Sequence, residues 1–159
     1  MLAPQVPVPN IHWEDFTPGQ VADYGPQTVS AEEIKSFAAE FDPQPMHLDD
    51  EAARATPVGG LCASGWHTCA VMMRILTDGF ILDSSSMGAT GCDEIKWLAP
   101  VRPGDSLRVR TTVLETRASA SRPAMGFVKA RFDMFNGHDV RVMTLTSHLM
   151  FGRRAAAGA

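Results

Sequence analysis

The chain has 159 residues, 45% hydrophobic and 20% charged, a composition typical of one globular domain with a single core. Its formal net charge of −4 argues against bulk binding to nucleic acid or to an anionic membrane. Three cysteines without paired spacing indicate a reducing compartment, and the N-terminus lacks a signal-peptide pattern. No apolar run approaches the ~20 residues of a membrane span. We therefore expect a cytoplasmic protein without nucleic-acid or membrane partners.

Charge is distributed unevenly along the chain. Residues 1–60 contain ten acidic and two basic residues, whereas residues 96–131 contain eight basic residues and only two acidic ones. The basic residues are Lys96, Arg102, Arg108, Arg110, Arg117, Arg122, Lys129 and Arg131. This excess fits either a solvated sheet face or a landing patch for a phosphorylated ligand, with at least one phosphate contact.

The first half of the chain is helical after a Pro-rich arm. Ser30 and Glu33 form a capping box, which opens an amphipathic helix that should end near Phe41, since Pro43 disfavours helix in the residue before it. Two prolines and a Gly-Gly pair then bracket a short helical turn around residues 50–55. We expect this segment to be ordered but irregular.

Residues 65–76, GWHTCAVMMRIL, have the length of a helix. Ser64 is a suitable N-cap, and Gly79 is a suitable stop. Few polar side chains interrupt this helix, and a helix that is apolar nearly all round is typically buried. We therefore predict a buried central helix.

The second half has the period-two pattern of antiparallel strands. Residues 107–113 and 128–134 alternate apolar and polar side chains, which predicts one buried and one solvated face. Asn136-Gly137 predicts a two-residue hairpin between the second of these strands and a partner over 140–151. Residues 88–97 are a further strand candidate.

Together these elements predict an α+β hot-dog fold, in which an antiparallel sheet of five or more strands wraps around the long apolar helix. We place the domain at residues 11–152, between an extended arm (1–10) and a flexible tail (153–159). Exposed sheet edges are commonly resolved by pairing between subunits, so we expect a homodimer, with a higher oligomer left open.

Asp42 and His47 are the candidate acid/base pair. In the sequence Asp42-Pro43-Gln44-Pro45-Met46-His47, the histidine lies five positions after the aspartate, and the two prolines restrict the backbone between them. A carboxylate and an imidazole around one water can divide general base and general acid work between them. The alternative is structural: Asp42 would cap a turn and His47 would be a hydrogen-bonded loop histidine.

The segment GGLCASGWH, residues 59–67, is the candidate substrate-binding loop. Gly60 allows a close backbone approach, and Ser64 and Gly65 open the buried helix. A free N–H at a helix N-terminus can stabilise a thioester oxygen as it becomes an enolate. The alternative is that the glycines only permit packing. Trp66 lines either the core or an acyl pocket.

A metal site is not expected, because the sequence has no CxxC or HExxH pattern. His67 and Cys69, two residues apart on a helix, do not share a face, and Cys62 precedes the helix. Cys62 and Cys69 are better explained as small core residues than as nucleophiles.

The segments FDPQPMHLDDEAA, ASGWHTCAVMMRIL and DEIKWLAPVRPGDSLRVRTTVLE resemble the MaoC-like dehydratases and R-specific enoyl-CoA hydratases. The resemblance covers residues 10–152. It implies the hot-dog fold, a dimer, Asp42 and His47 as the catalytic pair, and the Gly65 N–H as oxyanion donor. The chain departs from the family pattern at Gln44, at Ser64 and at Met73, which bears on acyl-chain preference and rate.

The resemblance implies a lyase of fatty acid metabolism that interconverts trans-2-enoyl-CoA and (R)-3-hydroxyacyl-CoA. It needs no cofactor, since coenzyme A is part of the acyl-CoA thioester substrate. One alternative is a hot-dog thioesterase, which frequently has a carboxylate on the central helix, whereas here no Asp or Glu lies between Glu51 and Asp78. The other is a non-catalytic acyl-CoA-binding partner subunit, which would not need both Asp42 and His47.

Overall fold

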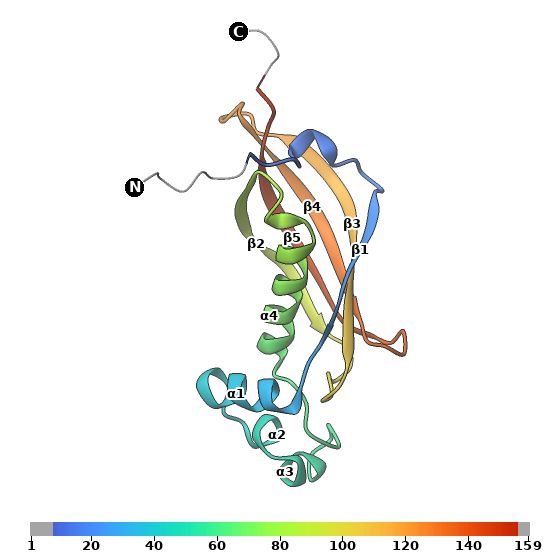
Figure 1. Ribbon diagram of the computed structural model, residues 1–159. Helices are drawn as coiled ribbons and strands as arrows, with labels where there is room; N and C mark the ends of the chain where they lie inside the picture. Colours follow the sequence, from blue (N-terminus) through green and yellow to red (C-terminus); the bar gives the residue numbers. More distant parts are fainter. Residues whose placement is uncertain (1–7, 156–159) are drawn as a thin grey trace, which may run out of the picture.

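The computed structural model describes residues 8–155 as one curved antiparallel sheet with a helix lying in its concave face (Figure 1). The elements in chain order are η1 (Trp13–Asp15), β1 (Val21–Thr28), α1 (Ala31–Phe41), α2 (Pro45–Leu48), α3 (Asp50–Arg54), α4 (Gly65–Leu76), η2 (Thr77–Ile81), β2 (Ser86–Trp97), β3 (Ser106–Ala118), β4 (Met125–Phe135) and β5 (Arg141–Gly152). This confirms the expected α+β hot-dog arrangement.

The five strands follow the order β1-β3-β4-β5-β2, and every neighbouring pair is antiparallel. The alternation expected for β3 and β4 is confirmed on the core face, where Leu107, Val109, Phe132 and Met134 are at most 1% exposed. On the opposite face Asp133 is also buried, because Arg131 and Arg141 pair with it. β1 and β2 form the two edges of the sheet.

The central helix α4 packs one side against the sheet. Val71, Met72, Ile75 and Leu76 are buried there, as expected. The opposite side is open in the single chain, because Trp66 is 61% and Met73 47% exposed. The expectation of a buried helix therefore holds for one side of α4 and not for the side that carries Trp66 and Met73.

The predicted stop at Gly79 is wrong, because the helix continues through it as the π-helical turn η2. A Cβ on Gly79 would lie 2.5 Å from Cδ1 of Tyr24. Glycine at this position lets β1 pack closely against the helix instead of ending it.

The predicted two-residue turn at Asn136-Gly137 is also wrong. The connection spans Asn136 to Val140, and the Asn136 N–H donates to the Val140 carbonyl. The Asn136 side chain accepts from the N–H groups of His138 and Val140, and the positive φ falls on Asp139 at 58°. These side-chain bonds stabilise a wider loop than the dipeptide indicates.

The helices α1, α2 and α3 cluster at the end of the molecule where α4 begins (Figure 1). The capping box of Ser30 and Glu33 and the end of α1 at Phe41 are confirmed. The one-turn helix α2, with Pro45 at its first position, was not expected. Within residues 8–155, no helix is long and apolar enough to cross a membrane.

The expected arm (1–10) lies mostly outside the described residues, as does the end of the expected tail. The tail begins with residues that are held in place. Arg153 lies over the ring of Trp13 at 5.1 Å, and Arg154 forms an ion pair of 2.6 Å with Asp15.

Candidate active site

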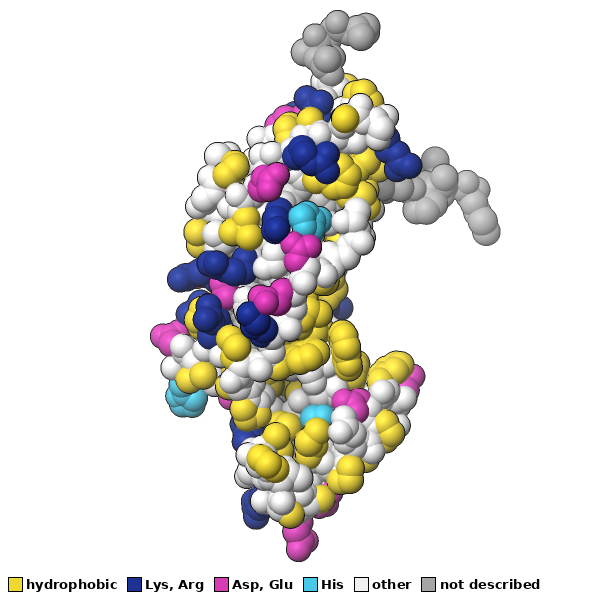
Figure 2. All heavy atoms as spheres, turned by 180° about the vertical axis from the view of Figure 1, so that it is seen from behind, with side chains coloured by type: hydrophobic (Ala, Val, Ile, Leu, Met, Phe, Trp, Pro, Cys, Tyr) yellow, Lys and Arg dark blue, Asp and Glu magenta, His cyan; other side chains and the backbone are white. Residues whose placement is uncertain are grey.

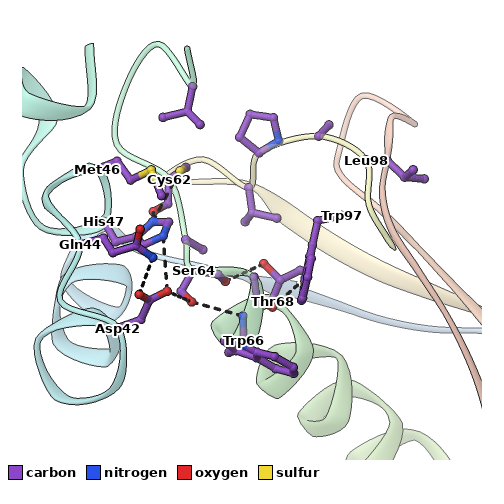
Figure 3. Close-up of a pocket in the computed structure, with 16 residues that line it drawn as sticks. Asp42, Gln44, Met46, His47, Cys62, Ser64, Trp66, Thr68, Trp97 and Leu98 are labelled. Atoms are coloured by element: carbon purple, nitrogen blue, oxygen red, sulfur yellow. Dashed lines mark hydrogen bonds and ion pairs between the residues drawn. The ribbon is translucent and has the colours of Figure 1, made fainter. Parts of the chain in front are cut away.

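A cavity of about 420 Å³ opens where the α1–α2 segment, the start of α4 and the end of β2 meet (Figure 3). Asp42 and His47 line one side, and Ser64, Gly65 and Trp66 line the helix side. The loop from Trp97 to Val101 completes the wall. The folded chain therefore brings together all the site residues expected from the sequence except Gly60.

Asp42 and His47 face each other across a short gap. Asp42 caps the C-terminus of α1, His47 lies in α2, and His47 Nε2 is 3.5 Å from Asp42 Oδ2. His47 Nδ1 lies 2.8 Å from the carbonyl oxygen of Cys62. Because a carbonyl only accepts hydrogen bonds, Nδ1 carries the proton, and in the neutral ring the Nε2 lone pair is directed toward Asp42. A water donating one proton to each group would fit these two acceptors.

Two side chains donate to the Asp42 carboxylate. The Ser64 hydroxyl donates to Oδ2 at 2.6 Å, and the Gln44 amide donates to Oδ1 at 2.7 Å. These hydrogen bonds, the Ser64 bond foremost, hold the pKa of Asp42 below its usual range. Asp42 is therefore an ionised carboxylate of low basicity. The sequence did not assign Gln44 a role in the site.

The N-terminus of α4 offers a donor to the cavity. Ser64 Oγ accepts the Trp66 N–H at 3.2 Å, while the Gly65 N–H meets no acceptor among the described residues. Gly65 is covered by Trp97, whose Nε1–H donates to the Gly65 carbonyl at 2.9 Å. Trp66 packs edge-on against Trp97 with ring centroids 5.4 Å apart. Trp97, not expected in the site, thus forms a wall of the cavity.

Gly60 is not among the residues that line the cavity. Its carbonyl accepts from Arg102 Nη1 at 2.6 Å, and the same guanidinium donates to the carbonyls of Val58 and Leu61. Arg102 therefore fixes the loop that leads to Cys62, whose carbonyl orients His47. Sequence reasoning included Arg102 only in the basic group.

The basic residues of 96–131 are largely neutralised. Figure 2, seen from the outer side of the sheet, shows basic and acidic side chains interleaved. Ion pairs join Arg110 to Asp23 at 2.8 Å and Lys129 to Asp93 at 2.9 Å, and others engage Lys96, Arg108 and Arg131. These ion pairs favour the solvated sheet face, and the phosphate contact stays a prediction.

The residues set aside as metal ligands or nucleophiles do not gather in one place. Cys62 is buried beside His47, and burial raises the pKa of its thiol. His67 stacks on Phe37 with ring centroids 4.7 Å apart. It lies on a second hollow between α1 and α4, away from Asp42 and His47.

Comparisons with known proteins agree with this fold. The family model described as "MaoC like domain" matches residues 15–130. An uncharacterized protein of Bacillus subtilis, YdeM, is 33% identical over 130 residues, which cover 81% of this chain and 90% of that protein. The crystal structure of a MaoC-like dehydratase from Rhodospirillum rubrum superposes with a TM-score of 0.86 at 42% identity, covering 92% of this chain and all of that one.

A more distant relative has a named reaction. The 3-hydroxyacyl-thioester dehydratase Z of Mycobacterium tuberculosis is 29% identical over 89 residues, which cover 55% of this chain and 59% of that protein. An antiparallel sheet wrapped around one central helix is the hot-dog fold, and the solved MaoC-like dehydratase shares it. The chain belongs to the MaoC-like dehydratase family.

Proposed function

We propose that this protein is a hydro-lyase that interconverts a trans-2-enoyl-CoA thioester and the (R)-3-hydroxyacyl-CoA thioester. One observation carries the proposal: His47 Nε2 and Asp42 Oδ2 lie 3.5 Å apart in the cavity that Gly65 also lines, and the Gly65 N–H meets no acceptor within residues 8–155. This arrangement provides a water site and an oxyanion donor within one cavity. The dehydratase family and the 3-hydroxyacyl-thioester relative support the same reaction class.

In the hydration direction, the water bound by Asp42 and His47 attacks C3 of the enoyl thioester. His47 Nε2 takes the proton that the water loses, and the electron pair of the double bond moves toward the thioester carbonyl. The Gly65 N–H stabilises the resulting enolate oxygen. His47 then returns the proton to C2, so one water is added and the enzyme is regenerated. A positioned acid or base of this kind contributes ~10²–10⁴-fold.

A thioesterase is the second candidate, and the structure provides fewer of the residues that thioester hydrolysis needs. α4, all of whose residues are described, carries no Asp or Glu to activate a water against the carbonyl carbon. The deciding assay follows the loss of enoyl absorbance across 2-enoyl-CoA chain lengths while free thiol is measured in parallel. Hydration consumes absorbance without releasing thiol, whereas hydrolysis releases thiol. Binding of acyl-CoA with neither change would indicate a non-catalytic subunit.

We also propose a homodimer in which a second copy pairs along the edge strand β2 and covers the open side of α4. Trp66, Met73, Trp97 and Leu98 are each 46–61% exposed and form an apolar surface beside that edge. Burial of such a surface stabilises association. The free thiols of Cys62, Cys69 and Cys92 support a cytoplasmic setting.

A further inference from the structure

Both oxygens of Asp42 are already held by the protein (Figure 3). Gln44 donates to Oδ1, and Ser64 donates to Oδ2, the same oxygen that faces His47. Ser64 is 0% exposed, so no bulk solvent competes for its hydroxyl. The carboxylate thus has one fixed rotamer and one fixed edge toward the cavity.

The Ser64 hydroxyl has only one proton, and its surroundings decide where that proton goes. Oγ accepts the N–H of Trp66, which is a donor only, so the hydroxyl proton is directed to Asp42. One side chain therefore connects the acid/base pair to the first turn of α4, the turn that presents the Gly65 N–H.

We infer that Ser64 is a positioning residue that keeps Asp42 a fixed carboxylate, so that Asp42 orients the water and His47 moves its proton. This division of roles rests on the proposed hydration. A carboxylate that already accepts two hydrogen bonds is a poor base. The Nε2 lone pair of His47 has no donor among the described residues, and Nδ1 is anchored on the Cys62 carbonyl.

The test is a cycle of Ser64→Ala in the wild type and in Asp42→Asn, with 2-enoyl-CoA hydration as the readout. In the wild type the substitution should lower kcat ~10–100-fold with KM changed less than about twofold, because only the water is misplaced. In Asp42→Asn it should lower kcat by less than about twofold. An equal loss in both backgrounds would show that Ser64 acts only through the helix, and would overturn the inference.

Ser30→Ala is the matched control, since it also removes a serine N-cap, at the far end of α1 from Asp42. It should lower the melting temperature but leave kcat within about twofold. A second measurement needs no turnover: ¹³C NMR titration of the Asp42 carboxyl, identified by its loss in Asp42→Asn. The Asp42 pKa should rise in Ser64→Ala, and an unchanged titration would refute the inference. A wild type that hydrates nothing would instead refute the proposed function.

Discussion

The indole of Trp97 lies against the α-carbon of Gly65, and its Nε1–H donates to the Gly65 carbonyl at 2.9 Å. A Cβ on residue 65 would lie 2.5 Å from Cε2 of this ring. The contact therefore ties glycine at the start of α4 to tryptophan at the end of β2. A larger residue at position 65 would therefore displace Trp97, which is part of the cavity wall.

Gly65→Ala should accordingly displace Trp97 and disturb the proposed oxyanion donor. We expect kcat to fall on the order of 10²-fold, as a displacement of about 1 Å can cause. Overpacking should cost about 1–3 kcal/mol of unfolding free energy, measured by urea denaturation. Gly137→Ala is the control, since its Cβ would meet nothing nearer than 3.8 Å. Equal activity of the two variants would contradict the proposed role of Gly65.

Asp42→Asn and His47→Gln should each reduce hydration ~10²–10⁴-fold. Because both residues serve one water, the double variant should be scarcely worse than either single one. From the sequence alone, both residues are expected on a loop, where such near-isosteric replacements change stability little. His47, however, is 5% exposed and bonded to the Cys62 carbonyl, so His47→Gln should also lower the melting temperature. A folded variant with near-normal turnover would exclude this pair as catalytic.

Arg102→Ala should loosen the loop between α3 and α4. It removes donors to the carbonyls of Val58, Gly60 and Leu61, and charge-assisted bonds contribute about 1.5–3 kcal/mol. We expect a loss of that order in urea denaturation and faster proteolysis within residues 56–61. Arg117→Ala, whose guanidinium lies over Phe127, should leave that loop unchanged. Similar proteolysis of both variants would show that Arg102 does not hold the loop.

Met73→Glu should weaken the proposed dimer. The substitution places a charge on the open side of α4, and desolvating that charge in an interface is costly. Light scattering should give about twice the 17.2 kDa chain mass for the wild type and a value near 17.2 kDa for the variant. Val140→Glu, in the β4–β5 connection, should remain dimeric. A monomeric wild type at micromolar concentration would refute the dimer.

His67 should make stability depend on pH. Burial lowers its pKa in the folded state, and its Nδ1 has no partner among the described residues. The unfolded chain therefore binds the proton more readily, so stability is full above the unfolded histidine pKa of about 6.5 and is lost as pH falls below it. Between pH 7 and pH 5 the melting temperature of His67→Gln should fall less than that of the wild type. His138 is exposed, so His138→Gln should show the same pH dependence as the wild type. If the melting temperatures of all three proteins fall in parallel with pH, His67 is not the source of the pH dependence.

Local pattern was sufficient for most of the fold. The capping box at Ser30, the apolar run of residues 65–76 and the alternation along β3 are short-range signals, and each appears where it was expected. The local pattern gave the wrong backbone at Gly79 and at Asn136-Gly137, where a side-chain contact determines the conformation. Tyr24 requires the glycine for close packing, and the Asn136 amide stabilises a wider loop.

The sequence by itself singled out the residues that we propose for the chemistry: Asp42 and His47 before the central helix, and Gly65 at its start. Only the tertiary structure decided how they are used. The bonds of Ser64 to Asp42, Cys62 to His47 and Trp97 to Gly65 span 22, 15 and 32 residues. No local periodicity encodes such contacts, because they exist only once the sheet has curved around α4 and brought these segments together.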